Sequence, residues 1–323
     1  MPSFKKPTFP FSYSVAAERQ RLRDWRDTQP GRAIPARKAG RLLLATWNIA
    51  NLGAQQRRPQ DHKLLAEIIS WFDLVAVQEV RDDLSGLRAI LDELPAGWRM
   101  LVSDASGNDE RLAFLYDGAK VEQLEKVGEI AIPPSELGDI KLPGVTQAFR
   151  GFDRNPYLAA FKAGTWRFLL VNVHLFFGSD DDQADMDRRA LEAYAVGRWA
   201  DLRTRDKDAY ARDIVALGDF NLPKVQPGEP VYAALRRRGL VVPQHSTEIG
   251  SNLAGDMHYD QIMFFPGQTE AEFTGKMGVF DFDGGIFPKL WQQLGQDLVP
   301  FRAYLRYYIS DHRPLWAEFR TTG

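Results

Sequence analysis

Cysteine is absent from the 323-residue sequence, which excludes disulfide bonds, thiolate nucleophiles and cysteine-ligated zinc. Long apolar runs are absent as well. None approaches the roughly 20 residues of a membrane span, and the first residues lack the apolar segment of a signal peptide. The net charge is only −2, so overall charge does not indicate a nucleic-acid partner. From these absences we expect a soluble, cytoplasmic protein, and nothing implies an obligate protein partner.

The charge that is present lies unevenly along the chain. Residues 1–41 carry ten Lys or Arg and three Asp or Glu, a net charge of +7. Prolines interrupt this region, and a short basic helix is predicted at about 15–28. We therefore expect a basic N-terminal extension, residues 1–40, followed by one large domain, residues 41–323. The extension either supplies phosphate contacts to a substrate or packs on the domain through its aromatic residues.

Five short polar clusters stand where predicted buried strands stop. The strands before the first four are runs of four apolar residues, which is typical of strands buried on both faces. Strands of one sheet that end together bring distant residues into one crevice. Asn, Glu, His and Asp side chains meeting there are typical of a hard-metal hydrolytic site. The clusters are Thr46-Trp47-Asn48, Gln78-Glu79, Asn172-Val173-His174, Gly218-Asp219-Phe220-Asn221 and Ser310-Asp311-His312.

Glu79 is the first candidate metal ligand. It follows a buried strand, and a carboxylate in that position needs a partner or a metal ion. Mg²⁺ is usually held by one or two carboxylates and keeps several waters, and Asn48 supplies a neutral oxygen nearby. The alternative is that Glu79 pairs with Arg81 or Arg111 at the end of the strand.

The histidines are candidates for proton transfer. Asp311 and His312 are neighbours, so their side chains diverge and each needs a distant partner. Asp260 is the candidate to orient His312, because a carboxylate on one imidazole nitrogen fixes the tautomer and raises the basicity of the other. His174 ends a strand, where a scaffold role is the competing interpretation. His258 shares a face with Asp260 if both lie on one strand.

Elsewhere the chain alternates between predicted helices and strands. Helices are expected after Asp61, from near Asp83, from the acidic segment 179–182 to about Arg205, and near 230–238. Further strands are expected at 112–116, 157–161, 259–264 and 315–319. Residues 266–308 are rich in aromatic side chains and are interpreted as an insertion that lines the rim of the site.

The five clusters, in this order, resemble the strand-end motifs of the endonuclease/exonuclease/phosphatase superfamily, which includes deoxyribonuclease I, abasic-site endonucleases, sphingomyelinases and inositol-polyphosphate 5-phosphatases. The resemblance covers about residues 41–320, and Asp219-Phe220-Asn221 and Ser310-Asp311-His312 are its most specific parts. It implies a four-layered α/β sandwich of two packed mixed β-sheets flanked by helices. The hydrophobic pattern itself shows only α and β elements in alternation.

Within this superfamily the chain looks closest to the deoxyribonuclease I type. Glu110-Arg111 is similar to the segment whose Glu orients the strand-end histidine. Arg154-Asn155-Pro156 resembles the segment whose Arg contacts substrate phosphate, although Asn155 stands where that segment has an acid. The resemblance therefore implies Mg²⁺, with Mn²⁺ or Ca²⁺ as substitutes, on Glu79 with Asn48 and Asp311.

The same resemblance implies roles for the remaining site residues. His312, oriented by Asp260, acts as general base or as donor to a phosphoryl oxygen, and His174 is oriented by Glu110. Asp219 positions the attacking water or protonates the leaving oxygen. Asn221 and Arg154 are expected to contact the substrate phosphate.

These assignments predict a Mg²⁺-dependent hydrolase of phosphodiester bonds, in particular a DNA endonuclease of deoxyribonuclease I type. Within the enzymes, the alternative is a phosphatase or phosphodiesterase acting on a lipid or a small phosphate ester. The alternative of another class is a catalytically inactive binding protein on the same fold.

Overall fold

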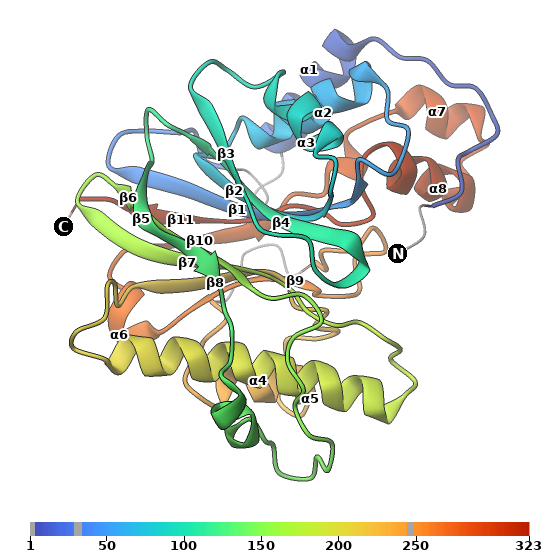
Figure 1. Ribbon diagram of the computed structural model, residues 1–323. Coiled ribbons are helices and arrows are strands. Elements are labelled where there is room, and N and C mark those ends of the chain that lie inside the picture. The colour runs from blue at the N-terminus through green and yellow to red at the C-terminus, as the bar shows by residue number, and fades with distance from the viewer. Residues whose placement is uncertain (1–3, 29–33, 244–248, 323) are drawn as a thin grey trace.

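Two β-sheets packed face to face form the centre of the molecule (Figure 1). The computed structural model describes residues 4–28, 34–243 and 249–322. The first sheet has the strand order β10-β11-β1-β2-β4-β3, and the second has the order β5-β6-β7-β8-β9. The strands are β1 (Arg41–Leu52), β2 (Leu74–Arg81), β3 (Trp98–Val102), β4 (Glu110–Asp117), β5 (Glu122–Glu129), β6 (Tyr157–Ala163), β7 (Trp166–His174), β8 (Ile214–Asp219), β9 (Asp260–Phe264), β10 (Phe273–Val279) and β11 (Leu315–Arg320).

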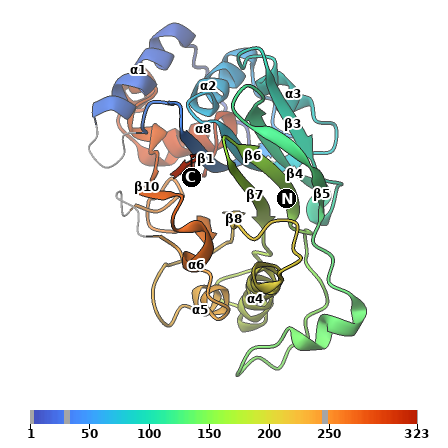
Figure 2. The same ribbon diagram turned by 90° about the vertical axis from the view of Figure 1, so that its left-hand side faces the viewer.

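Helices cover both outer faces of the sheet pair, as Figures 1 and 2 show. On the first sheet lie α1 (Val15–Thr28), α2 (Pro59–Ile69), α3 (Ser85–Leu91), α7 (Pro288–Gln293) and α8 (Leu298–Tyr308). The second sheet carries α4 (Gln183–Arg205), α5 (Pro230–Arg236) and α6 (Pro266–Thr269). Between the sheets, residues such as Leu44, Phe114 and Leu217 form a shared apolar core. The predicted four-layered α/β sandwich is confirmed.

Both sheets are mixed, and each contains one parallel pair. Strands β1 and β2 run parallel, with Asn48 opposite Gln78. Strands β7 and β8 also run parallel, with His174 opposite Asp219. Parallel strands end together, so each pair brings its polar residues to one edge. The Gln78 side chain also joins the two sheets, because its Nε2 donates to Asn172 Oδ1 at 2.6 Å.

The first three polar clusters and Gly218-Asp219 of the fourth belong to the strands themselves, which corrects the prediction that they follow them, whereas Phe220-Asn221 and Ser310-Asp311-His312 lie outside the strands. Strand β2 continues through Glu79, and its pairing shifts register beyond Val77 with β4 and beyond Gln78 with β1. Glu79 adopts a left-handed backbone conformation, with φ of 60°. Such a conformation is uncommon for a residue with a Cβ, and it turns the Glu79 side chain out of the regular alternation of the strand.

The predicted helices are largely confirmed. Helix α1 covers the expected range, and α4 begins after the acidic segment, where the Asp182 side chain accepts from the backbone N–H groups of Ala184 and Asp185. The helix expected from near Asp83 is α3, which is only two turns long. No helix within the described ranges is long and apolar enough to cross a membrane.

The N-terminal extension packs on the domain through its aromatic residues. The ring of Phe9 stacks on Tyr304 of α8 at 6.0 Å, and Phe11 meets Phe287 edge-on at 5.7 Å. The Tyr13 hydroxyl donates to Asp61 Oδ1 at 2.7 Å. Phe9, Phe11 and Tyr13 therefore pack on the domain, which was one of the two alternatives for the extension.

The aromatic segment 266–308 does not line the rim of the site, so this prediction was wrong. Its strand β10 forms the edge of the first sheet, and Phe280 and Phe282 are fully buried in the core under the helices. Its helices α7 and α8 receive the N-terminal extension instead. Burying aromatic surface against the extension is the physical reason for the composition of this segment.

Candidate active site

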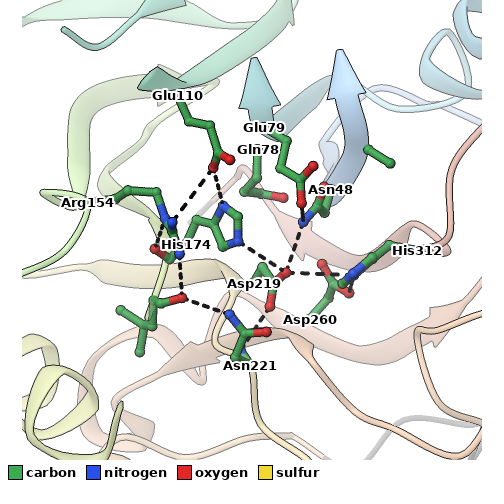
Figure 3. A network of polar contacts seen from close by, with 12 residues as sticks. Asn48, Gln78, Glu79, Glu110, Arg154, His174, Asp219, Asn221, Asp260 and His312 are labelled. Atoms are coloured by element: carbon green, nitrogen blue, oxygen red, sulfur yellow. Dashed lines mark hydrogen bonds and ion pairs between the residues drawn. The ribbon is translucent and has the colours of Figure 1, made fainter. Parts of the chain in front are cut away.

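Asp219, the last residue of β8, is the centre of a polar network at the common edge of the two sheets (Figure 3). Its Oδ2 accepts from Asn48 Nδ2 at 2.9 Å, and its Oδ1 accepts from the backbone N–H of Asn221 at 2.8 Å. Burial alone would raise the pKa of Asp219, but the charges of His312 and His174 and these two hydrogen bonds outweigh it and lower the pKa. Asp219 is therefore ionised.

His312 forms a buried pair with Asp260, as the sequence predicted. The His312 Nδ1 lies 2.7 Å from Asp260 Oδ2 and 3.8 Å from Asp219 Oδ2. Asp219 and Asp260 are directly opposite residues of the antiparallel strands β8 and β9, which places both carboxylates beside the ring. Burial acts to lower the pKa of His312, but the two carboxylates raise it well above its usual value. The two carboxylates therefore favour the protonated ring.

His174 lies on the other side of Asp219. Its Nε2 is 3.8 Å from Asp219 Oδ2, and its Nδ1 is 3.1 Å from Glu110 Oε2. Burial of Glu110 would raise its pKa, but its contact with His174 and the charge of Arg154 lower it below its usual value. The two histidines thus flank one carboxylate, and each has a second carboxylate behind it (Figure 3).

Arg154 does not occupy the position that a phosphate contact needs. Its Nε donates to the carbonyl of His174 and its Nη2 to the carbonyl of Leu175, both at 2.8 Å, and only 2% of the residue is exposed. Because its guanidinium is held in this way, the prediction that Arg154 contacts the substrate phosphate directly was wrong. Arg154 instead fixes the end of β7, because a buried guanidinium is held by the acceptors around it.

The end of β8 and the turn after it contain two unusual backbone conformations. Gly218 has φ of +135°, and a Cβ there would lie 2.1 Å from the carbonyl oxygen of Val173. Only glycine allows this close approach of β8 to β7. Asn221, with φ of 48°, donates from Nδ2 to the carbonyl of Leu175 at 2.7 Å. The second hydrogen of that amide nitrogen is left for another acceptor.

Glu79 and Asn48 fit a hard cation. Glu79 Oε1 accepts from Asn48 Nδ2 at 2.9 Å, and Oε2 accepts from the backbone N–H of Asn51 at 2.7 Å. Asn48 Oδ1 is buried and has no hydrogen-bond partner among the residues that the structure describes. Asp311 lines the same cavity, and burial together with the charge of Glu79 raises its pKa. An unpartnered amide oxygen beside two carboxylates is a suitable donor set for Mg²⁺.

The arginines considered as partners for Glu79 have other contacts. Arg81 donates to the carbonyl of Asn108, and Arg111 pairs with Asp82. A second acidic group, Asp219 with Asp260 and His312, offers atoms within 4.8 Å of one another that could hold a metal ion. Two atoms of this group, Asp260 Oδ2 and His312 Nδ1, already contact each other at 2.7 Å.

A cavity of about 230 Å³ opens onto this network. Six of the predicted residues line it: Glu79, His174, Asp219, Asn221, Asp311 and His312. The other four, Asn48, Glu110, Arg154 and Asp260, are buried behind them.

The cavity also has lining residues that sequence reasoning missed. They are Asn51 and the aromatic residues Phe4, Phe177 and Tyr259. Phe177 and Tyr259 stand close to His174 and Asp260 in sequence, and that proximity is a signal which could have found them. His258 lies in the loop before β9 and not on the strand, which removes the argument for a third site histidine.

A buried carboxylate of α4 supports the loops around the site. Glu192 is fully buried, and its two oxygens accept from the backbone N–H groups of Asp153 and Phe176, each at 2.9 Å. These residues stand next to Arg154 and Phe177. Burial raises the pKa of Glu192 to about 7. A Glu within the apolar face of a helix was a signal in the sequence that pointed to such a role.

Comparison with known proteins finds relatives in sequence and in structure, while no family model matches the chain. Over 211 residues it is 33% identical to a deoxyribonuclease of Thioalkalivibrio sp. (strain K90mix), covering 63% of this chain and 52% of that protein. Over 313 residues it is 26% identical to the human endonuclease/exonuclease/phosphatase family domain-containing protein 1, covering 87% of this chain and 49% of that protein. The chain spans about half the length of both relatives.

Solved structures share the fold. Humanized D. rerio TDP2 matches with a TM-score of 0.56 at 15% identity, over 88% of this chain and all of that chain. The Bacteroides thetaiotaomicron mannosyl-6-phosphatase matches with a TM-score of 0.54 at 18% identity, over 86% of this chain and 99% of that chain. These matches show the fold, which the chain also shares with a solved endonuclease/exonuclease/phosphatase family protein of Bacteroides thetaiotaomicron at a TM-score of 0.54. The sequence relatives and the strand-end residues support the resemblance to that superfamily.

Proposed function

We propose that this protein is a Mg²⁺-dependent hydrolase of phosphodiester bonds and that its substrate is DNA, cleaved as by an endonuclease of deoxyribonuclease I type. The observation that carries the proposal is the ionised Asp219 between two histidines, beside the unpartnered oxygen of Asn48. Hydrolysis of a phosphodiester needs a group to orient water, a donor for the leaving oxygen and positive charge on the phosphoryl group. The network contains a candidate for each of these three roles.

The residues that would hold the metal ion are Glu79, Asn48 and Asp311. When bound, Mg²⁺ supplies positive charge that polarises a phosphoryl oxygen. Asn51 contributes by fixing the Glu79 carboxylate through its backbone N–H. Mn²⁺ and Ca²⁺ prefer the same oxygen ligands and are expected as substitutes.

Proton transfer falls to the residues around Asp219. Its carboxylate orients the attacking water and accepts its proton, while Asn48 and the Asn221 backbone hold it in place. His312 has Nδ1 on Asp260, so its Nε2 donates to a phosphoryl oxygen or to the leaving oxygen. His174 approaches the phosphate from the opposite side with Glu110 behind it.

Asn221 holds the phosphate through its remaining amide hydrogen. One hydrogen of the Asn221 amide already binds the Leu175 carbonyl, which leaves the second hydrogen for the phosphate. DNA is favoured as substrate because the relative with the higher identity bears the name deoxyribonuclease. The chain matches only about half of that relative, so the substrate remains part of the proposal.

One assay separates this proposal from its alternatives. The purified protein is incubated with plasmid DNA, with phospholipid and with sugar phosphates, each with Mg²⁺ and then with EDTA. The proposal expects cleavage of DNA that EDTA abolishes. His312→Ala should lose this activity, whereas His62→Ala, a matched change at a half-buried histidine on α2, should keep it.

Other outcomes contradict the proposal in different ways. Turnover of phospholipid or sugar phosphate without DNA cleavage would identify a phosphatase or phosphodiesterase of lipids or small esters. Binding of any of these ligands without turnover would identify an inactive binding protein. Full DNA cleavage in EDTA would remove the metal from the mechanism.

A further inference from the structure

Three aromatic side chains line the catalytic cavity, and they come from opposite halves of the molecule. Phe177 follows β7 and Tyr259 precedes β9, so both belong to the second sheet. Their rings meet edge-on at 6.2 Å, and the Tyr259 ring lies 5.7 Å from that of His312. The third is Phe4, from the N-terminal extension, far from the other two in sequence.

Phe4 is brought to the cavity by a segment that is anchored along its length. We call residues 4–13 the N-terminal strap; in Figure 1 it runs past α7 and α8 toward the label N. Phe9 and Phe11 fix its middle on the aromatic rings of α8 and of the residue before α7, Phe287. Nearer the cavity, Arg306 of α8 lies over the Phe4 ring at 5.1 Å. The strap is therefore part of the packed structure, and its Phe4 end is directed at the site.

None of the roles assigned above uses these three rings. Proton transfer and metal binding need oxygen and nitrogen atoms, which the phenyl groups of Phe4 and Phe177 do not supply, and the roles above do not use the Tyr259 hydroxyl. A half-buried Phe4 beside the carboxylates of Glu79 and Asp311 leaves apolar aromatic surface facing the space where the substrate must lie. Aromatic surface of this kind, beside a site that handles phosphate, is suited to stacking on a planar base.

We propose that Phe4, with Phe177 and Tyr259, forms a stacking surface for one unpaired base of the substrate, next to the phosphodiester that is cleaved. The inference rests on the proposed function and names its substrate class. Only a base that has left the duplex presents its face to an aromatic side chain, so the preferred substrate is single-stranded DNA or an unpaired segment of it. Phe4 is the specificity-determining member, because it alone comes from the strap.

The test begins with the wild-type protein, Mg²⁺ and a short fluorescein-labelled oligodeoxynucleotide, single-stranded or as a blunt duplex. Absence of cleavage of either strand form refutes the proposed function and, with it, this inference. Faster cleavage of the single strand supports the inference. Faster cleavage of the duplex overturns the inference and leaves the proposed function intact.

Variants then isolate the role of Phe4. Phe4→Ala should raise KM for the single strand about tenfold, which lies within the range that stacking of one base provides, and leave kcat nearly unchanged. Phe4→Tyr keeps a ring and should behave as wild type. Tyr210→Ala is the matched control, since Tyr210 is an exposed aromatic residue on the loop that enters β8 at the strand end opposite Asp219.

A base-free oligomer distinguishes stacking from a structural effect. A tetrahydrofuran-phosphate chain of the same length has the phosphates but no bases, so it should inhibit wild type and Phe4→Ala equally. Weaker inhibition of Phe4→Ala by this oligomer, or an unchanged KM for DNA, would overturn the inference. So would a rise in kcat/KM in Phe4→Ala, because the strap would then obstruct the site.

Discussion

The pairing of Asp260 with His312 gives the sharpest test of the proposed mechanism. The His312 Nδ1 lies 2.7 Å from Asp260 Oδ2, Asp260 is fully buried, and His312 is 9% exposed. A positioned acid or base typically contributes about 10²–10⁴-fold to rate, or roughly 3–5 kcal/mol of barrier. If Asp260 acts only by orienting His312 and stabilising its charge, removing either residue removes the same contribution.

The experiment is a double-mutant cycle on the rate of DNA cleavage. Asp260→Asn and His312→Ala should each lower kcat/KM by about 10³-fold, and the double variant should be within about tenfold of His312→Ala. Asp256→Asn is the matched control, because Asp256 is an exposed carboxylate in the loop before β9 that bonds Asn252. Its rate should equal that of wild type.

Stability must be followed beside the rates, because each single change leaves a buried polar group without its partner. Breaking a buried ion pair costs up to about 3–5 kcal/mol, and the cavity beside His312 lowers this figure because water can enter. Urea titrations at the assay temperature show whether each variant is folded. Penalties that multiply to about 10⁶-fold in folded variants would refute the reasoning, since Asp260 and His312 would then act independently.

Three further changes test separate parts of the structure. Gly218→Ala should cost about 2–5 kcal/mol in urea unfolding, because its Cβ would lie 2.1 Å from the Val173 carbonyl oxygen at a φ of +135°; a normal midpoint would contradict the turn geometry. Glu79→Gln should raise the Mg²⁺ concentration for half-maximal activity by tenfold or more, and an unchanged Mg²⁺ dependence would exclude Glu79 as a ligand. Burial raises the pKa of Glu192 from 4.5 to about 7, so the folded state binds more protons between these values and stability falls as pH rises through them. Relative to Glu192→Gln, wild type should lose up to about 3 kcal/mol from pH 4.5 to 7, measured by urea unfolding, and parallel pH profiles would show that Glu192 does not titrate there.

The candidate site could be predicted in outline because it follows from local sequence. An apolar run that ends in polar residues marks the end of a buried strand, and β1, β2, β7 and β8 all show this pattern. Their parallel pairing then places Asn48, Glu79, His174 and Asp219 at one edge. Only the first step follows from local sequence; the pairing of the strands and the packing of the two sheets were implied by the family resemblance.

The orientation of individual side chains was less predictable. Glu79 was expected after its strand, but it lies within β2 at a shift of register with a left-handed backbone. Neither residue type nor periodicity indicates such a conformation. Arg154 was expected at the substrate phosphate, yet the carbonyls of His174 and Leu175 hold it inside. Which way a long side chain turns at a strand end depends on acceptors that only the folded chain brings near.

The N-terminal extension and the aromatic segment 266–308 show why distant partners are hardest to predict. Each contains aromatic side chains that its own neighbourhood cannot bury. The aromatic segment was assigned to the rim of the site, and the extension was assigned either to substrate phosphate or to packing on the domain. In the structure they bury one another, as Phe9 with Tyr304 and Phe11 with Phe287 show. Exposing clusters of aromatic side chains to water costs free energy. Two such segments in one chain are therefore better interpreted as packing against each other than as two separate exposed surfaces. Phe4 is the exception, because it lies beyond the anchored rings and lines the cavity of the candidate site.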